Sequence, residues 1–177
     1  SSKQSTEANK DFMFLWQQIH DKQTCNDILL KYITTDIEDV YERLLTFSKS
    51  NVVQQVIPIA RKRLDVFMPI FLQHVLLAEQ PTLVLDRFLS ILKKIVQRST
   101  YISLLTENQN KLINLFKLVQ VSQWVSQYIS THPLLLDEVL RMDNSYEPPS
   151  LSEMQKQLKT SAQSSAGDLE KYMEHLR

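Results

Sequence analysis

The chain has 177 residues, of which 43% are hydrophobic, and its 20 Lys and Arg balance its 20 Asp and Glu, so the formal net charge is zero. This hydrophobic content favours a folded core over disorder, and the balanced charge disfavours nucleic-acid binding, whose affinity comes from neutralising phosphates. The single glycine, Gly167, disfavours hairpin-rich sheets and glycine-rich phosphate loops, because both need positive φ angles or bare backbone.

Cysteine usage and hydropathy indicate the compartment. Cys25 is the single cysteine, so no internal disulfide can form, which is typical of a reducing environment. No apolar run approaches the roughly 20 residues that cross a bilayer, and no signal peptide opens the chain. We expect a cytoplasmic protein with no membrane partner. The start at Ser1-Ser2 and the stop at Arg177 within an apolar-periodic segment favour a piece of a longer protein.

The first third of the chain predicts short helices. Residues 1–10 are polar, and we expect them to fray. Apolar side chains then recur at the helical spacing i, i+3, i+4 and i+7, at Phe12, Leu15, Trp16 and Ile19. A polar stretch, 21–26, is expected to end this helix, and a short apolar segment, 28–33, follows. The spacing of residues 35–38 is that of a capping box, which predicts a helix start.

Prolines organise the middle of the chain. Residues 52–60 have the β-branched content of a strand, but Pro58 favours two helical pieces that meet there. Pro69 is expected to kink the next helix. Pro81 suits a first helical turn, and the clearest amphipathic stripe of the sequence follows at Leu85, Phe88, Leu89, Leu92, Ile95 and Val96.

Shorter helices are predicted at about 99–106, 109–119 and 122–131, before a break at His132-Pro133. We expect four large side chains of this region in the core: Trp124, Tyr128, Leu135 and Leu136. The predicted fold class is all-α, an irregular multi-helix bundle with no sheet. Residues 1–140 are predicted to form a helical body. Residues 141–177, with Pro148-Pro149 and a Ser/Ala-rich stretch, are predicted to form a hinge and the start of a connection to a following domain; a passive tether is the alternative.

The chain lacks the motifs of the common catalytic sites. Two-metal nucleotidyl transfer needs close carboxylates, commonly an Asp-x-Asp pair, and none occurs. The four histidines are far apart in sequence, and Cys25 is expected to be a small buried hydrophobe. We therefore predict no catalytic, cofactor-binding or metal-binding residue in this chain. The basic run 61–63 is expected to be a solvated helix face.

Several strings taken together resemble one family. They are Arg63-Leu64-Asp65 with Met68-Pro69, Arg98-Ser99-Thr100-Tyr101, residues 104–108, residues 122–125, residues 132–140, Tyr146-Glu147-Pro148-Pro149 and Gly167-Asp168-Leu169-Glu170. In this order they resemble the central region of the bifunctional glutamine-synthetase adenylyltransferase and adenylyl-removing enzyme. The match covers residues 61–177, whereas residues 1–60 agree only in helical character. Glycines expected near residues 22–24 and near Ala60 are missing, so the loops there are expected to differ.

The resemblance implies a regulatory role. In that family, two nucleotidyltransferase domains flank a helical middle, and they attach AMP from ATP to glutamine synthetase or remove it. A PII-type signal protein and glutamine set the balance. The chain would be the middle piece, free of cofactors itself, whereas ATP and Mg are implied for the parent enzyme. Candidates for contacts with the flanking domains are Arg98, Tyr101, Asp137, Glu138 and Tyr146.

Two other functions are alternatives. A free-standing helical adaptor or scaffold domain explains the composition without any parent enzyme. A catalytic domain in its own right would need a carboxylate or histidine cluster assembled by the fold. The 132–138 string has two interpretations: a turn that opens a buried helix, with Asp137 and Glu138 exposed, or a contact surface for a partner domain.

Overall fold

The computed structural model describes residues 2–121, 123–141, 156 and 159. Over these residues the chain forms ten helices and no strands, which confirms the all-α prediction. The helices are α1 (Ser2–Gln17), α2 (Lys22–Leu29), α3 (Ile37–Lys49), α4 (Asn51–Gln54), α5 (Pro58–Leu76), α6 (Pro81–Ile95), α7 (Ser99–Glu107), α8 (Gln109–Val121), α9 (Gln123–Thr131) and α10 (Pro133–Arg141). The chain divides into residues 1–139 and 140–177, and the packing described here is that of the first unit.

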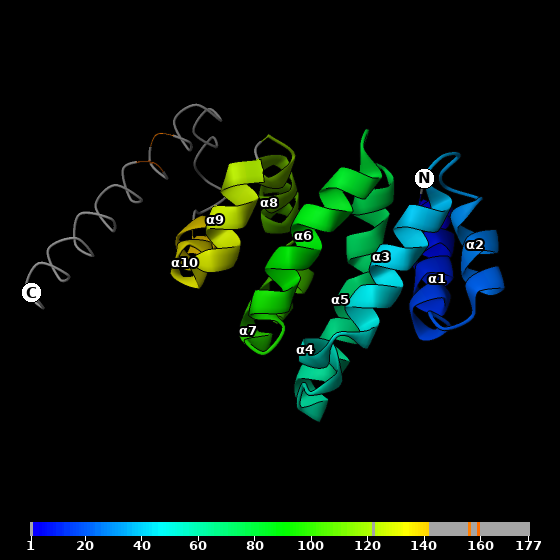
Figure 1. Ribbon diagram of the computed structural model, residues 1–177, viewed down its shortest axis with the longest axis horizontal. Coiled ribbons are helices and arrows are strands. Elements are labelled where there is room, and N and C mark those ends of the chain that lie inside the picture. Colours follow the sequence, from blue (N-terminus) through cyan, green and yellow to red (C-terminus); the bar gives the residue numbers. More distant parts are fainter. Residues whose placement is uncertain (1, 122, 142–155, 157–158, 160–177) are drawn as a thin grey trace, which may run out of the picture. The chain divides into compact units, whose positions relative to one another are not determined.

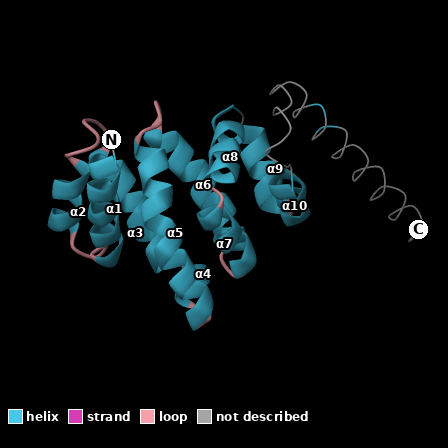
Figure 2. Ribbon diagram, turned by 180° about the vertical axis from the view of Figure 1, so that it is seen from behind, coloured by secondary structure: helices cyan, strands magenta, loops and turns pink. Residues whose placement is uncertain are grey.

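Two long helices, α5 and α6, organise this unit. Helix α5 packs against α1 and α7, whereas α6 packs against α3, α8 and α9. Figures 1 and 2 show α3, α5 and α6 between α1 with α2 and α8 with α9. None of the helices among the described residues combines the length and the apolar character needed to cross a lipid bilayer.

Aromatic rings join α5, α6 and α8 in the core. Phe71 lies 5.6 Å from Phe67, 4.9 Å from Phe88 and 5.7 Å from Phe116, measured between ring centroids. Phe88 and Phe116 are themselves 4.8 Å apart. Offset and tilted arrangements at these distances stabilise aromatic pairs beyond the area that they bury. The cluster therefore fixes α5, α6 and α8 against one another.

The predictions made from periodicity and proline hold in the middle of the chain. Pro58 and Pro81 begin α5 and α6, where a missing N–H costs nothing. All six residues of the predicted α6 stripe are buried. The three shorter predicted helices correspond to α7, α8 and α9 within two residues at each end. Pro69 lies inside α5, and the kink expected there stays a prediction.

The prediction that residues 1–10 fray is wrong, because α1 already begins at Ser2. Two features of this segment stabilise the helix. Thr6 Oγ1 donates a hydrogen bond to the carbonyl of Ser2 at 2.8 Å, and Gln73 Nε2 of α5 donates to Asn9 Oδ1 at 3.3 Å. Packing of α1 on α5 outweighs the polar composition that led to the prediction.

The polar stretch 21–26 is also a helix rather than a gap. Asp21 is the N-cap of α2: its side chain accepts hydrogen bonds from the backbone N–H of Thr24 at 3.2 Å and from Thr24 Oγ1 at 2.8 Å. The first of these bonds satisfies an N–H group that the first turn leaves unpaired. The predicted capping box at 35–38 does not form, since Asp36 precedes α3 at φ 60° and makes no side-chain capping bond.

Of the four side chains predicted for the core, Leu136 is fully buried, and the side chain of Leu135 lies outside the described part. Trp124 is 41% exposed, and Tyr128 is only partly buried. Helix α9 instead turns its Val125 and Ile129 stripe to the core. The prediction was therefore wrong for Trp124. The hinge predicted after residue 140 lies outside the described residues, except for residues 141, 156 and 159.

Candidate functional site

Three of the five predicted contact residues come together around Tyr101. Arg98 directly precedes α7, and the backbone N–H of Tyr101 donates to its carbonyl at 3.0 Å. Asp137 lies on α10. The side chain of Tyr101 is hydrogen-bonded to the side chains of both Asp137 and Arg98. The cluster therefore ties α10 to the start of α7, although the two helices are separated by α8 and α9 in the sequence.

The phenol of Tyr101 is hydrogen-bonded to two side chains of opposite charge. Its hydrogen bond to the Asp137 carboxylate, together with partial desolvation, raises the pKa of Tyr101, because a phenol donates this bond only while it is protonated. The Arg98 guanidinium opposes the shift by favouring the phenolate. At neutral pH, Tyr101 is thus a protonated donor to Asp137, and its oxygen accepts from Arg98.

The two remaining candidates do not join this cluster. Glu138 is exposed, as predicted, because consecutive residues on a helix point in different directions. Asp137 is half-buried rather than exposed. Tyr146 lies outside the described residues.

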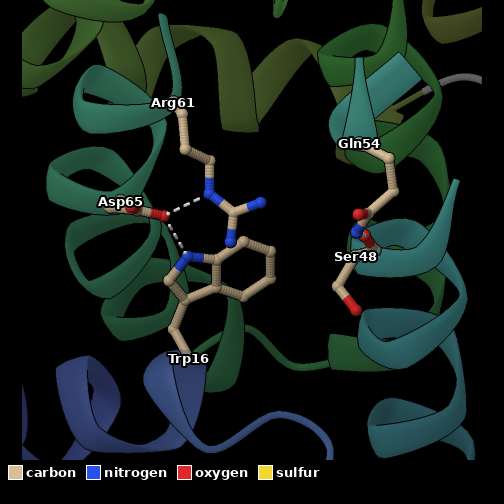
Figure 3. Close-up of polar contacts among 5 residues, drawn as sticks. All are labelled: Trp16, Ser48, Gln54, Arg61 and Asp65. Carbon is tan, nitrogen blue, oxygen red and sulfur yellow. Dashed lines mark hydrogen bonds and ion pairs between the residues drawn. The ribbon is translucent and has the colours of Figure 1, made fainter. Parts of the chain in front are cut away.

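A second polar cluster joins α1 to α5, as Figure 3 shows. Trp16 Nε1 donates to Asp65 Oδ1 at 2.8 Å, and Arg61 Nε donates to the same oxygen at 3.0 Å. The guanidinium carbon of Arg61 lies 5.8 Å from the centre of the Trp16 ring, within reach of a cation–π interaction. Arg61 is therefore part of an inter-helix contact, whereas Lys62 is exposed as the solvated-face prediction requires.

Beside this cluster, Gln54 and Ser48 connect α4 to the end of α3 (Figure 3). Gln54 Nε2 donates to the carbonyl of Ser48 at 2.7 Å. The carbonyls of a last helical turn have no partner within the helix, so Gln54 satisfies one of them. Ser48 itself is buried and donates through Oγ to the carbonyl of Leu45 at 2.8 Å.

Only one signal for the Trp16 cluster was visible in the sequence. Arg61 and Asp65 have the i, i+4 spacing of a helical ion pair. The partner Trp16 is 49 positions away from Asp65, and nothing in a local pattern indicates that contact.

The surface is hollowed between α1 and α5. This cavity of about 540 Å³ has Phe12 and Leu76 among its lining residues. At its wall, the Tyr32 hydroxyl donates to Asp11 Oδ2 at 2.6 Å, and Lys31 Nζ lies 3.5 Å from the same oxygen. Burial, followed by this bond, raises the pKa of Tyr32. In the part of the chain that the structure describes, no three His, Cys, Asp or Glu side chains gather as a metal site would require.

Cys25 is a small buried hydrophobe, as predicted. It has no exposed surface, and its Sγ lies 3.1 Å from the carbonyl oxygen of Gln18 and 3.5 Å from that of Leu15. Burial raises the pKa of the thiol to about 11. Since the thiolate is the reactive form, this environment suppresses nucleophilic chemistry near neutral pH.

Comparison with known proteins identifies relatives of this sequence. No family model matches the chain. It is 32% identical over 168 residues to the bifunctional glutamine synthetase adenylyltransferase/adenylyl-removing enzyme of Pseudomonas syringae pv. tomato. The aligned region covers 94% of this chain and 17% of that enzyme. The enzyme of the same name from Pseudomonas putida is 33% identical over 164 residues, 92% of this chain and 17% of its own length. The chain is homologous to a part of these enzymes.

The homology confirms part of the resemblance inferred from the sequence. The chain spans about a sixth of the length of these two relatives, at 17% of each. The similarity also reaches beyond residues 61–177, since the Neisseria meningitidis enzyme aligns with 98% of the chain at 28% identity. Residues 1–60 therefore share more than the helical character assigned to them.

Proposed function

We propose that the chain is the non-catalytic central regulatory and linker segment of an enzyme that adenylylates and deadenylylates glutamine synthetase. The observation that carries this proposal is the homology, which extends over 94% of this chain but only 17% of a bifunctional relative. A helical segment that makes up about this fraction of the enzyme is compatible with a region that connects two nucleotidyltransferase domains. The parent enzyme would use ATP and Mg and would respond to a PII-type signal protein.

The use of its carboxylates supports a structural role for this segment. Asp65 binds Trp16 and Arg61, Asp11 binds Tyr32, Asp86 binds Arg43 and Asp137 binds Tyr101. Two-metal nucleotidyl transfer needs carboxylates that are free to hold a pair of divalent ions about 3.5–4 Å apart. These four are committed to bonds that join one helix to another segment of the chain.

The packing supports a rigid body that orients its neighbours. Helices α5 and α6 each contact several other helices, and the Phe71 cluster fixes them together. Native packing density allows such a body to transmit a displacement with little internal deformation. In this proposal, residues 141–177 connect the body to a following catalytic domain, and the Arg98, Tyr101 and Asp137 cluster fixes the helix that leads to this connection.

The alternative function is a free-standing helical adaptor. A segment exchange distinguishes this adaptor from the proposed linker segment. The chain replaces the aligned segment of the Pseudomonas putida enzyme, and both activities on glutamine synthetase are measured with and without glutamine and a PII-type protein. We expect both activities to persist and to remain responsive. An exchanged enzyme that folds but loses both activities would favour the adaptor.

The non-catalytic part of the proposal has its own test. The purified chain, incubated with ATP, Mg and glutamine synthetase, is expected to transfer no AMP. Transfer that depends on Mg and survives repurification of the chain would contradict the proposal.

A further inference from the structure

The cavity between α1 and α5 has the size and the walls of a small-molecule site. Three segments line it: the first three turns of α1, the end of α5 and the turn that follows α2. Its volume of about 540 Å³ lies in the range that is usual for such sites. Phe12, Ala8 and Leu76 give it apolar walls. The cavity therefore suits one organic molecule with an apolar body.

Asp11 presents a carboxylate oxygen with spare bonding capacity at this cavity. Its Oδ2 accepts from the Tyr32 hydroxyl at 2.6 Å and lies 3.5 Å from Lys31 Nζ. Its Oδ1 makes no hydrogen bond in the described part of the chain. The Asp11 side chain is 20% exposed, so the Tyr32 bond holds a carboxylate that is largely shielded from water. A charge in this setting acts more strongly on a neighbour than a charge in bulk water does.

The charged side chains that line the cavity sum to a negative charge. Glu7 and Asp11 lie one helical turn apart on α1, and the cation among the lining residues is Lys31. The Lys31 side chain is 58% exposed, so solvent screens it more than it screens Asp11. Lys3 and Lys10 are outside the lining set, and their positions on α1 are about a third of a turn or more from the centre of the lining face.

Two further observations agree with this sign. Burial raises the pKa of Tyr32, and the negative charges of Asp11 and Glu7 raise it further. Helix α5 ends at Leu76, and Gln73 and Leu76 of its last turn line the cavity. The carbonyls of a last turn have no partner within the helix and form the negative end of its dipole.

We propose that this cavity binds a small organic amine, with the ammonium group at Asp11 Oδ1 and the apolar body against Phe12 and Leu76. An ammonium group has three donors, which suits a wall made of a carboxylate and helix carbonyls. An anion of the same shape would face both Glu7 and Asp11, and a neutral analogue would gain no charge-assisted hydrogen bond. This inference does not depend on the proposed function.

Three probes of one shape test the sign of the site. The full chain, labelled for NMR, is titrated with phenethylamine, with the neutral phenethyl alcohol and with the anionic hydrocinnamate. We expect the amine to shift the amide signals of Ala8 and Gln73 and to bind at least about 5-fold more tightly than the alcohol, with the anion weakest. Added salt should reduce the advantage of the amine over the alcohol.

Two variants locate the binding. Asp11→Asn keeps the shape and removes the charge, so it should weaken amine binding about 5-fold and leave alcohol binding unchanged. Asp86→Asn is the matched control, because Asp86 pairs with Arg43 on other helices and its loss should not affect either probe. Ala8→Phe fills the cavity and should weaken the binding of both probes. Circular dichroism checks the fold of each variant.

The comparison of probes on the unaltered chain decides the proposal even if a variant does not fold. Equal affinities for the amine and the alcohol, or an amine titration that leaves the Ala8 and Gln73 signals unmoved, overturn it. A short lysine-containing peptide that binds as tightly as the amine would overturn the small-molecule assignment and indicate a side chain of a partner protein.

Discussion

Trp16 and Asp65 are joined by a hydrogen bond of 2.8 Å that connects α1 to α5 across 49 positions of the sequence. The same Asp65 oxygen accepts from Arg61 at 3.0 Å. Trp16 is 3% exposed, so its N–H has little access to water if the carboxylate is removed. The Trp16–Asp65 hydrogen bond is therefore expected to contribute more to stability than the exposed Arg61–Asp65 ion pair does, since a buried donor without an acceptor is costly.

Asp65→Ala is expected to lower the free energy of unfolding by about 2 kcal/mol, because it leaves the Trp16 N–H unpaired. Urea titration followed by circular dichroism measures the change. Asp86→Ala is the matched control: its ion pair with Arg43 is short, at 2.6 Å, but Asp86 is 62% exposed. That loss is expected to be below about 1 kcal/mol. Equal losses would contradict the role assigned to Trp16.

The sequence predicted well where one face of a helix carries all the apolar residues. The α6 stripe is an example, since its six members recur with helical period and all are buried. Pro58 and Pro81 marked helix starts because their missing N–H is harmless only there. These are local properties, and a single sequence carries them in full.

The errors arise where the outcome depends on distant packing. Helix α9 has two neighbouring apolar stripes, Trp124 with Tyr128 and Val125 with Ile129, and the period alone does not say which one faces the core. The polar start of α1 is helical because of α5, which is remote in sequence. Among the candidate contact residues, the approach of Asp137 to Tyr101 likewise depends on how α10 returns to α7.

Leu136→Ala is expected to lower the free energy of unfolding by about 2–5 kcal/mol, because Leu136 is fully buried and its truncation leaves a cavity. Leu134→Ala, two positions away on α10, is the control, since Leu134 is 74% exposed and should change stability by less than about 0.5 kcal/mol. Thermal unfolding compares the two. Similar melting temperatures would place α10 away from the core.

Cys25 should make stability fall in alkaline solution. Burial raises the pKa of its thiol from 9.0 to about 11 in the folded chain. Below pH 9 both states hold the proton, so this contribution is fully present; between about pH 9 and 11 only the unfolded thiol ionises, and stability is lost. Urea midpoints of the unaltered chain and of Cys25→Ala, measured across this range, should converge as pH rises. Parallel curves would contradict the buried environment.

The last prediction concerns the bridge between α7 and α10. Tyr101→Phe removes the donor to Asp137 and the acceptor for Arg98, and it should cost about 1 kcal/mol because Asp137 is only half-buried and Arg98 is exposed. Tyr128→Phe is the control, since in the described part of the chain that ring makes stacking contacts and its hydroxyl has no hydrogen bond. Global stability alone does not distinguish a bridge from a general packing defect, so hydrogen exchange is measured as well. Loss of the bridge should speed exchange of the α10 amides while those of α6, which packs on α3, α8 and α9, keep their protection. Uniform acceleration across α6 and α10 would mean that Tyr101 supports the whole unit and does not hold α10 specifically.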